Sequence, residues 1–297
     1  LEHVLAPRVN WESDWEIDLH IRNFHPQTRA WFFQKVDAWL DEKKNGASST
    51  PRMLILLGDP GVGKSGLAVA LCRRRKDVVL AKHFCRHSND LKRSPDVMVR
   101  SLAFQLAERE DVIPEYRERL QAELAAQGLG PSELRLLGPA ALFDVLLVRP
   151  LRALSRERRL PEGPLLLVID ALDESELERK NEMLQLIESE FEKLPEQFRF
   201  LLTSRPEQPV QDLVLGPHHS SARRRSSSSS EAQQPVVQER LRRFRPEVLR
   251  AKDGENLRDM EIYLRDILLS RVRPAAAFEE AVQLMLWKSE GLFLYTY

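Results

Sequence analysis

The chain has 297 residues, of which 42% are hydrophobic and 30% are charged, and this ordinary globular composition excludes wholesale disorder. Lys and Arg together number 45, as do Asp and Glu, so the overall charge gives no indication of a specific nucleic acid or another polyanion as partner. The longest apolar runs are too short to span a bilayer, no secretory leader opens the chain, and two cysteines are too few for a disulfide framework, so the sequence predicts an intracellular, cytoplasmic protein without a membrane partner.

Residues 1–50 are predicted to form an N-terminal approach segment followed by a linker helix. Residues 1–25 show no clear period, but beyond Pro26 apolar side chains recur with helical spacing at Phe32, Val36, Trp39 and Leu40. This stripe would pack on the domain that follows it.

The next stretch is a phosphate-binding loop. It fits G-x-x-x-x-G-K-[ST] and lies between an apolar run at 53–57, read as a strand, and a predicted helix at 65–75. Its glycines allow successive N–H groups to converge on polyphosphate oxygens, and the helix adds its positive dipole end. Lys64 would reach the terminal phosphates, and the Ser65 hydroxyl would complete the shell of a Mg²⁺. The predicted nucleotide contacts are Gly58, Asp59, Pro60, Gly61, Val62, Gly63, Lys64, Ser65 and Gly66.

Predicted strands and helices alternate beyond this loop. A second apolar run opens at Asp77 and ends at 83–85, so strand, helix and strand make a βαβ unit and hence a parallel sheet. Helices are predicted at 97–107, after the cap Ser94-Pro95-Asp96, at 114–127, and at 139–154 with a kink at Pro150. Strands at 165–170 and 198–203 flank a helix at 176–192. This pattern predicts an α/β fold of three layers around a central parallel sheet, with the nucleotide-binding core at 51–216.

The C-terminal part is predicted to hold an insertion and a small α-helical subdomain. Residues 217–238, rich in Ser and Arg, form a low-complexity insertion that we expect to be disordered, as a solvated linker in preference to a phosphorylation-switched tract. Residues 239–297 would complete the core and begin the subdomain, with helices at 257–269 and 274–287. The chain starts without Met and stops inside the apolar run 292–295, so we expect it to be a fragment of a longer protein.

Acidic residues follow the apolar run 165–169. Asp170 ends this strand, and in a parallel sheet it would lie on the same edge as the phosphate-binding loop, where it could hold Mg²⁺. Asp173 or Glu174 could polarise an attacking water. Arg205 follows the next strand, where it could bind the γ-phosphate or only cap the strand end.

Two further clusters have a structural interpretation that the sequence favours. His83, Cys85 and His87 would share a face of a strand and could bind a metal, but no fourth ligand suggests itself, so a packed strand end is favoured. The basic cluster 242–245 fits a solvated surface better than a nucleic-acid site.

Three segments together resemble a known family. The loop at 58–65, the run LLLVIDALDE at 165–174 and FLLTSRP at 200–206 resemble the NACHT family of signal-transducing P-loop ATPases, in the STAND class. The diagnostic feature is a small residue, Ala171, directly after Asp170, with acids beyond it. Further similarities lie at 29–40, 83–87, 244–246 and 289–295. The pattern looks most like NACHT modules that precede ankyrin, tetratricopeptide or WD-type repeats.

The resemblance implies a P-loop NTPase that acts as a switch. ADP would hold a closed form, exchange for ATP would open it, and opened modules would oligomerise to bring effector domains together. It implies ATP or ADP and Mg²⁺ as cofactors, with self-association and protein partners through flanking domains that this chain lacks.

Three function classes remain open from the sequence. The first is an ATP/ADP switch with slow Mg²⁺-dependent ATP hydrolysis, in which nucleotide acts through its different affinity for two conformations. The second is a phosphotransferase, a nucleotide or small-molecule kinase, which would need an acceptor pocket and an Arg-rich lid. The third is a scaffold that binds nucleotide without hydrolysing it. A GTPase is disfavoured because the chain has no Asn-Lys-x-Asp stretch.

Overall fold

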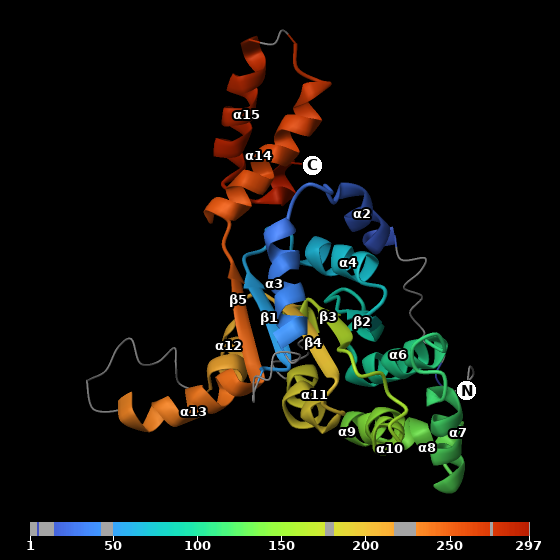
Figure 1. Ribbon diagram of the computed structural model, residues 1–297. Helices are drawn as coiled ribbons and strands as arrows, with labels where there is room; N and C mark the ends of the chain where they lie inside the picture. The colour runs from blue at the N-terminus through green and yellow to red at the C-terminus, as the bar shows by residue number, and fades with distance from the viewer. Residues whose placement is uncertain are drawn as a thin grey trace.

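The computed structural model describes residues 5, 15–42, 50–175, 181–216, 230–273 and 276–296 (Figure 1). Within them, five strands form one sheet in the order β2-β3-β4-β1-β5, and every pairing is parallel. The strands are β1 (Met53–Gly58), β2 (Val79–Phe84), β3 (Leu165–Asp170), β4 (Phe198–Ser204) and β5 (Phe244–Leu249). Every residue of β1, β3 and β4 is buried, which explains their continuous apolar runs.

The order of the strands places β4 between β1 and β3. Leu57 of β1 pairs with Ser204, and Ile169 of β3 pairs with Leu202, so all three strands end at the same edge. The phosphate-binding loop after β1, the polar end of β4 and Asp170 at the end of β3 therefore lie in one row. A shared edge for these groups was predicted, but the position of β4 between β1 and β3 was not, because the order of the strands in the sheet differs from their order in the chain.

Helices cover both faces of the sheet and confirm the predicted three layers. Alternate residues of β1 point to opposite faces of the sheet. Met53, Ile55 and Leu57 pack in one apolar core, and Leu54 and Leu56 pack in the other. The first core is covered by α6 (Pro95–Glu108), α7 (Tyr116–Ala126), α8 (Pro131–Leu136), α9 (Pro139–Phe143), α10 (Arg149–Arg156), α11 (Glu182–Glu190) and α12 (Gln208–Leu215). The second is covered by α2 (Trp15–Asn23), α3 (Ala30–Asp41) and α4 (Lys64–Arg74).

The predicted stripe on the linker helix is confirmed. Phe32, Val36, Trp39 and Leu40 of α3 are buried in the second core, and the Trp39 Nε1–H donates to the Pro51 carbonyl at 2.7 Å. The Ser94 cap is also confirmed, because its Oγ accepts the Val97 N–H at the start of α6.

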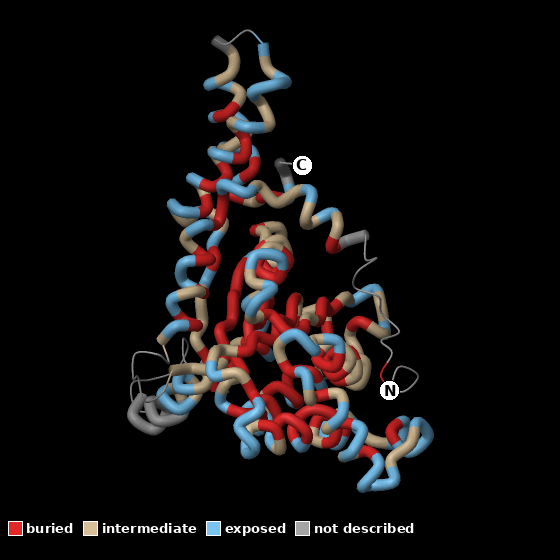
Figure 2. The backbone as a smooth tube through the Cα atoms, turned by 45° about the vertical axis from the view of Figure 1, so that its right-hand side comes forward, coloured by how far each residue is buried: buried red, intermediate tan, exposed pale blue. Residues whose placement is uncertain are grey.

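A small helical subdomain follows β5, as predicted. Helices α14 (Gly254–Leu269) and α15 (Ala276–Ser289) and the 3₁₀ turn η6 (Phe293–Thr296) pack around Met260, Tyr263, Leu264 and Phe293. Figure 1 shows the two helices projecting beyond the end of β5, and Figure 2 shows that their outer ends are less buried than the part nearest the sheet. None of the described helices has the length and apolar character to cross a membrane.

The predicted boundary of the insertion is wrong. Helix α13 (Ser230–Arg243) begins inside the predicted disordered segment 217–238, because helix-forming residues follow the serine run; residues 217–229 lie outside the described part of the chain. The solvated-surface interpretation of 242–245 is also wrong in part, because Phe244 opens β5 and is fully buried. Pro246 argues against a strand in the sequence, but among the described strands β5 pairs with β1 alone, and proline is tolerated in such an edge strand.

The helix predicted at 139–154 contains a π-helical turn. The segment η2 (Asp144–Val148) separates α9 from α10 immediately before Pro150, so the predicted distortion takes the form of a wider turn. The short helices α5 (Asp90–Arg93), η3 (Leu172–Ser175) and η4 (Phe191–Lys193) complete the fold. Of the helix predicted at 176–192, residues 176–180 lie outside the described residues.

Candidate functional site

The loop between β1 and α4 has the backbone that its glycines allow. Gly61 and Gly63 adopt φ values of 78° and 97°, a region that side chains with a Cβ rarely adopt. Gly58 is required for packing instead, since a Cβ there would lie 2.6 Å from the Leu249 carbonyl oxygen of β5. Helix α4 begins at Lys64, so its N-terminal N–H groups lie beside the loop.

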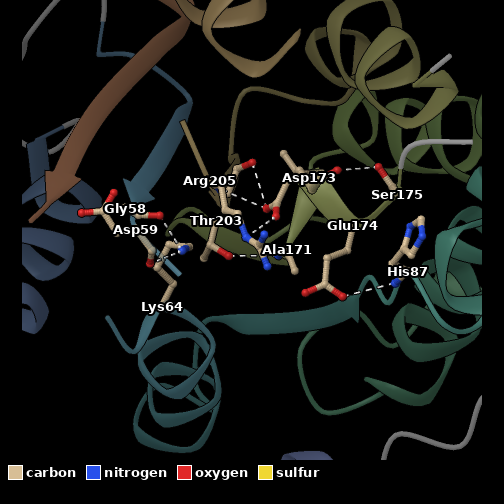
Figure 3. A network of polar contacts seen from close by, with 12 residues as sticks. Gly58, Asp59, Lys64, His87, Ala171, Asp173, Glu174, Ser175, Thr203 and Arg205 are labelled. Carbon is tan, nitrogen blue, oxygen red and sulfur yellow. Dashed lines mark hydrogen bonds and ion pairs between the residues drawn. The ribbon is translucent and has the colours of Figure 1, made fainter. Parts of the chain in front are cut away.

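Lys64 lies between this loop and the acids at the end of β3. Its Nζ donates to the carbonyl oxygens of Gly58, at 2.6 Å, and Asp59, at 3.0 Å (Figure 3). Burial lowers the pKa of Lys64, and the negative charges of Asp173 and Asp170 oppose that shift. The ammonium is therefore held at the loop by neighbouring carboxylates as well as by backbone oxygens.

Asp170 is buried at the end of β3. The Thr203 hydroxyl of β4 donates to its Oδ1, and the same hydroxyl accepts the Ala171 N–H at 3.0 Å. Burial raises the pKa of Asp170, whereas hydrogen bonds from Thr203 and Ser65 lower it. The Ser65 hydroxyl and the Asp170 carboxylate thus form an adjacent pair of hard oxygen donors, and these are the ligands that Mg²⁺ prefers.

The residue after Asp170 has an unusual backbone. Ala171 adopts a φ of 57°, and its small side chain limits the steric penalty of this left-handed conformation. The turn sends the chain back across the end of β4, which brings Asp173 to the strand's last residues. The small residue noted in the sequence therefore has a conformational role.

Asp173 is held by the end of β4. Its Oδ1 accepts the Ser204 hydroxyl at 3.2 Å and the Arg205 N–H at 2.9 Å, and its Oδ2 lies 3.1 Å from Arg205 Nε. Both carboxylate oxygens are occupied in this way. The structure brings Asp173 and Arg205 to the same edge, as predicted, and places them in an ion pair with each other.

Glu174 points to the other side of the row, toward the segment after β2 (Figure 3). Its Oε2 accepts the His87 N–H at 3.2 Å, and its Oε1 lies 3.8 Å from Arg86 Nη1. With 23% of its side chain exposed, Glu174 is more accessible than Asp173, at 5%. Sequence reasoning missed Arg86, which was noted only as part of the similarity at 83–87.

The interpretation of His83, Cys85 and His87 as a packed strand end is the one that the structure supports. His83 is fully buried with its Nε2 2.8 Å from the Lys92 carbonyl oxygen, and Cys85 is buried as well. Within the described residues no cluster of three His, Cys, Asp or Glu side chains could hold a metal. The metal-trio alternative is therefore wrong.

A cavity of about 390 Å³ opens at the phosphate-binding loop, and its walls come from three parts of the chain. The sheet edge and loop contribute the predicted residues Pro60, Gly61, Gly63, Lys64, Ser65, Gly66, Asp173, Glu174 and Arg205. Sequence reasoning missed the walls from the N-terminal segment and the subdomain, which include His20, Asn23, Phe24, His25, Thr28, Arg29, Phe293 and Leu294. The only sequence signals were the similarities at 29–40 and 289–295, which suggested no contact.

The family model described as "Nephrocystin 3, N-terminal" matches residues 27–205, more than half of the chain. The chain belongs to this family. The matched part of the nephrocystin 3 N-terminal region runs from just before α3 to Arg205, so it contains the phosphate-binding loop, Asp170 and both following acids. Together with the parallel sheet and the loop, this confirms a P-loop NTPase.

Two solved structures have a remote similarity to the chain. The Walker-type ATPase PABY2304 of Pyrococcus abyssi is 18% identical over 92% of this chain and 68% of its own, with a TM-score of 0.48. A chain of the Drosophila ORC bound to GC-rich DNA and Cdc6 is 11% identical over 93% of this chain and 40% of its own, with a TM-score of 0.36. No curated protein matches the chain.

Proposed function

We propose that this member of the nephrocystin 3 N-terminal family is a nucleotide-dependent switch of the NACHT kind, in the STAND class, that binds ATP and ADP with Mg²⁺ and hydrolyses ATP slowly. The observation that carries the proposal is the three-part wall of the cavity. A ligand there touches the core, the N-terminal segment and the helical subdomain at once, so its presence biases how these parts are arranged.

The phosphates would lie along the loop. The N–H groups around Gly61 and Gly63 and the N-terminus of α4 would hold the phosphate oxygens, and Lys64 would turn from its carbonyl partners to the terminal phosphates. Ser65 and Asp170 would hold Mg²⁺, with Thr203 fixing the carboxylate. An ion held by these two residues would supply positive charge to offset that of the phosphates.

The base would lie where the N-terminal segment faces the subdomain. Phe24 and Phe293 offer aromatic surface to an adenine ring, and His25 and Thr28 add polar groups on the same wall. We propose ATP and ADP as ligands because no guanine-reading stretch exists in the chain.

Slow hydrolysis follows from the partners of the two acids. Asp173 is fully engaged by Ser204 and Arg205, and Glu174 is oriented toward Arg86 and the His87 N–H. Because these contacts engage the carboxylate oxygens, an attacking water would have to compete with a protein partner before either acid could orient it, and this would make hydrolysis slow. The same observation favours a second candidate, a scaffold that binds nucleotide without hydrolysing it.

Equilibrium binding of a fluorescent ADP analogue, with competition by ATP and GTP, tests the proposal. Lys64→Ala removes a charge-assisted contact that contributes ~1.5–3 kcal/mol to the binding free energy. We therefore expect the affinity to fall by about 10- to 100-fold. Lys35→Ala, an exposed lysine on α3 paired with Glu247, is the control and should bind as the wild type does. Unchanged affinity in Lys64→Ala, or GTP competing better than ATP, would contradict the proposal.

A further inference from the structure

Two successive carbonyls of the phosphate-binding loop accept hydrogen bonds from outside the core. The Leu294 N–H of the subdomain donates to the Gly61 carbonyl at 3.2 Å. The Arg29 guanidinium, just before α3, donates through Nη2 to the Val62 carbonyl at 2.7 Å. The loop is thus bound both to the N-terminal segment and to the subdomain.

Arg29 connects these two contacts. Its Nη1 donates to Asn256 Oδ1 at 2.7 Å, its backbone N–H donates to Asp259 Oδ2 at 3.0 Å, and its guanidinium carbon lies 4.5 Å from the centre of the Phe293 ring. The residue is buried, with 3% exposure, and holds a left-handed φ of 66°. A buried arginine in an uncommon backbone conformation is retained only where surrounding contacts fix it.

Asn256 extends the network to the ends of the subdomain. Its Nδ2 donates to the carbonyls of Ala251, before α14, at 2.6 Å and Gly291, after α15, at 2.8 Å. Gly291 has a φ of 82°, and a Cβ there would lie 2.0 Å from the Ala251 carbonyl oxygen. The segments before α14 and after α15 therefore both bind Asn256, the side chain that also binds Arg29.

The contact at Val62 also orients the loop's N–H groups. The Val62 carbonyl and the Gly63 N–H belong to one peptide unit, and in a trans peptide they point in opposite directions. Because Arg29 holds the Val62 carbonyl, the Gly63 N–H points away from Arg29, and an anion on that side of the loop would accept its hydrogen bond. In the preceding unit Leu294 holds the Gly61 carbonyl, and the Val62 N–H donates to the Asp59 carbonyl within the loop.

We propose that Arg29 is a positioning residue that couples phosphate binding at the loop to the docking of the helical subdomain. Phosphate favours the loop conformation in which the Gly63 N–H is available to it, and that conformation is the one that Arg29 and Leu294 bind. Phosphate binding and docking therefore strengthen each other, and by linkage the effect is reciprocal. The inference rests on the proposed function, because it takes the loop to bind phosphate.

Amide hydrogen exchange with magnesium tripolyphosphate as the probe tests the coupling. Tripolyphosphate can bind the loop but has no base that could touch Phe293. Slower amide exchange in α14 would therefore report an effect transmitted from the loop, and not a direct contact between the probe and the subdomain. In the wild type we expect tripolyphosphate to slow exchange at 58–66, at 254–269 and at 290–294. In Arg29→Lys, whose single ammonium cannot span Val62 and Asn256, exchange at 254–269 should be about 10- to 100-fold faster without ligand and respond little to it.

Two more variants complete the design. Arg74→Lys makes the same substitution on α4, over the Phe33 ring, and should behave as the wild type. Gly291→Ala acts from the subdomain's end without touching Arg29 and should also uncouple α14, which keeps the test valid if Arg29→Lys folds poorly.

The outcomes separate the two proposals. If tripolyphosphate protects 58–66 but α14 does not respond, or if both Arg29→Lys and Gly291→Ala respond as the wild type does, the coupling is refuted while the phosphate site stands. If neither tripolyphosphate nor magnesium ADP protects 58–66 in the wild type, the proposed function fails and the coupling fails with it.

Discussion

Replacing Thr203 by Val tests the pairing of β3 with β4 at the candidate site. Thr203 is fully buried, donates to Asp170 and accepts from the Ala171 N–H. Valine keeps the shape but removes the hydroxyl, so one hydrogen bond to a carboxylate is lost and one partly buried N–H loses its partner. The lost hydrogen bond lowers the free energy of unfolding by ~1.5–3 kcal/mol and the unpaired N–H by a further ~1–3 kcal/mol, whereas the extra buried methyl group raises it by ~0.8 kcal/mol. We expect the free energy of unfolding to fall by about 3 kcal/mol.

Urea unfolding followed by tryptophan fluorescence measures this change as a lower midpoint at unchanged slope. Thr203→Ser is the matched control, because it keeps the hydroxyl and removes only a methyl group, for about 1 kcal/mol. A double-mutant cycle with Asp170→Asn should give an interaction free energy of roughly 1–3 kcal/mol. If Thr203→Val and Thr203→Ser were equally stable, the hydroxyl would not hold Asp170 and the geometry argued for the metal site would be wrong.

Three further predictions concern the acids, a glycine and a buried histidine. Glu174→Gln should slow ATP turnover on the order of 10²-fold at unchanged ADP affinity, whereas Asp173→Asn should mainly lower the stability of the fold. Steady-state phosphate release measures the turnover of both variants. If both were fully active, neither acid would activate water. Gly58→Ala should lower the unfolding free energy by about 1–3 kcal/mol because its Cβ meets Leu249, whereas Gly163→Ala, with no atom within 4 Å, should not; equal urea midpoints would contradict this. Burial lowers the pKa of His83 from 6.5 to about 4. Between these two pH values the unfolded chain binds more protons at this residue than the folded chain does. The contribution of neutral His83 to stability is therefore complete above pH 6.5 and is lost as the pH falls to 4. His83→Gln should therefore remove about 3 kcal/mol of the pH dependence of stability between 6.5 and 4, and parallel curves for the two proteins would refute the assignment.

Local chemistry accounts for what the sequence predicted correctly. The phosphate-binding loop, the strand that ends at Asp170 and the cap at Ser94 depend on residues within a few positions of one another. Each carries its own backbone requirement, such as a positive φ or an N-cap oxygen. For this reason the fold class and the row of site residues could be read before any contact was known.

The missed features depend on contacts between distant segments. Arg29 binds partners 33, 227 and 230 residues away, and no spacing rule in the sequence relates these positions. The strand β5 was missed because Pro246 is acceptable only at a sheet edge, and the strand order that makes it an edge is a tertiary property. The N-terminal segment was predicted to be only an approach segment, and its part in the cavity was missed. Its cavity-lining residues lie beside residues of the loop and of the subdomain and form no periodic face that the sequence could reveal.

The roles of the acids show the same division. The sequence predicted that Asp173, Glu174 and Arg205 gather at one edge, and they do. It did not predict that Asp173 and Arg205 would pair with each other, because this depends on β4 lying between β1 and β3. Whether either acid activates water stays a prediction.

The most direct measurement is to incubate the purified chain with magnesium ATP, remove free nucleotide, and quantify retained ATP, retained ADP and released phosphate per protein. A nucleotide switch should retain nearly one nucleotide per chain, with ADP increasing slowly at a rate that matches phosphate release. Rapid multiple turnover, or no retained nucleotide in a folded protein, would contradict the account.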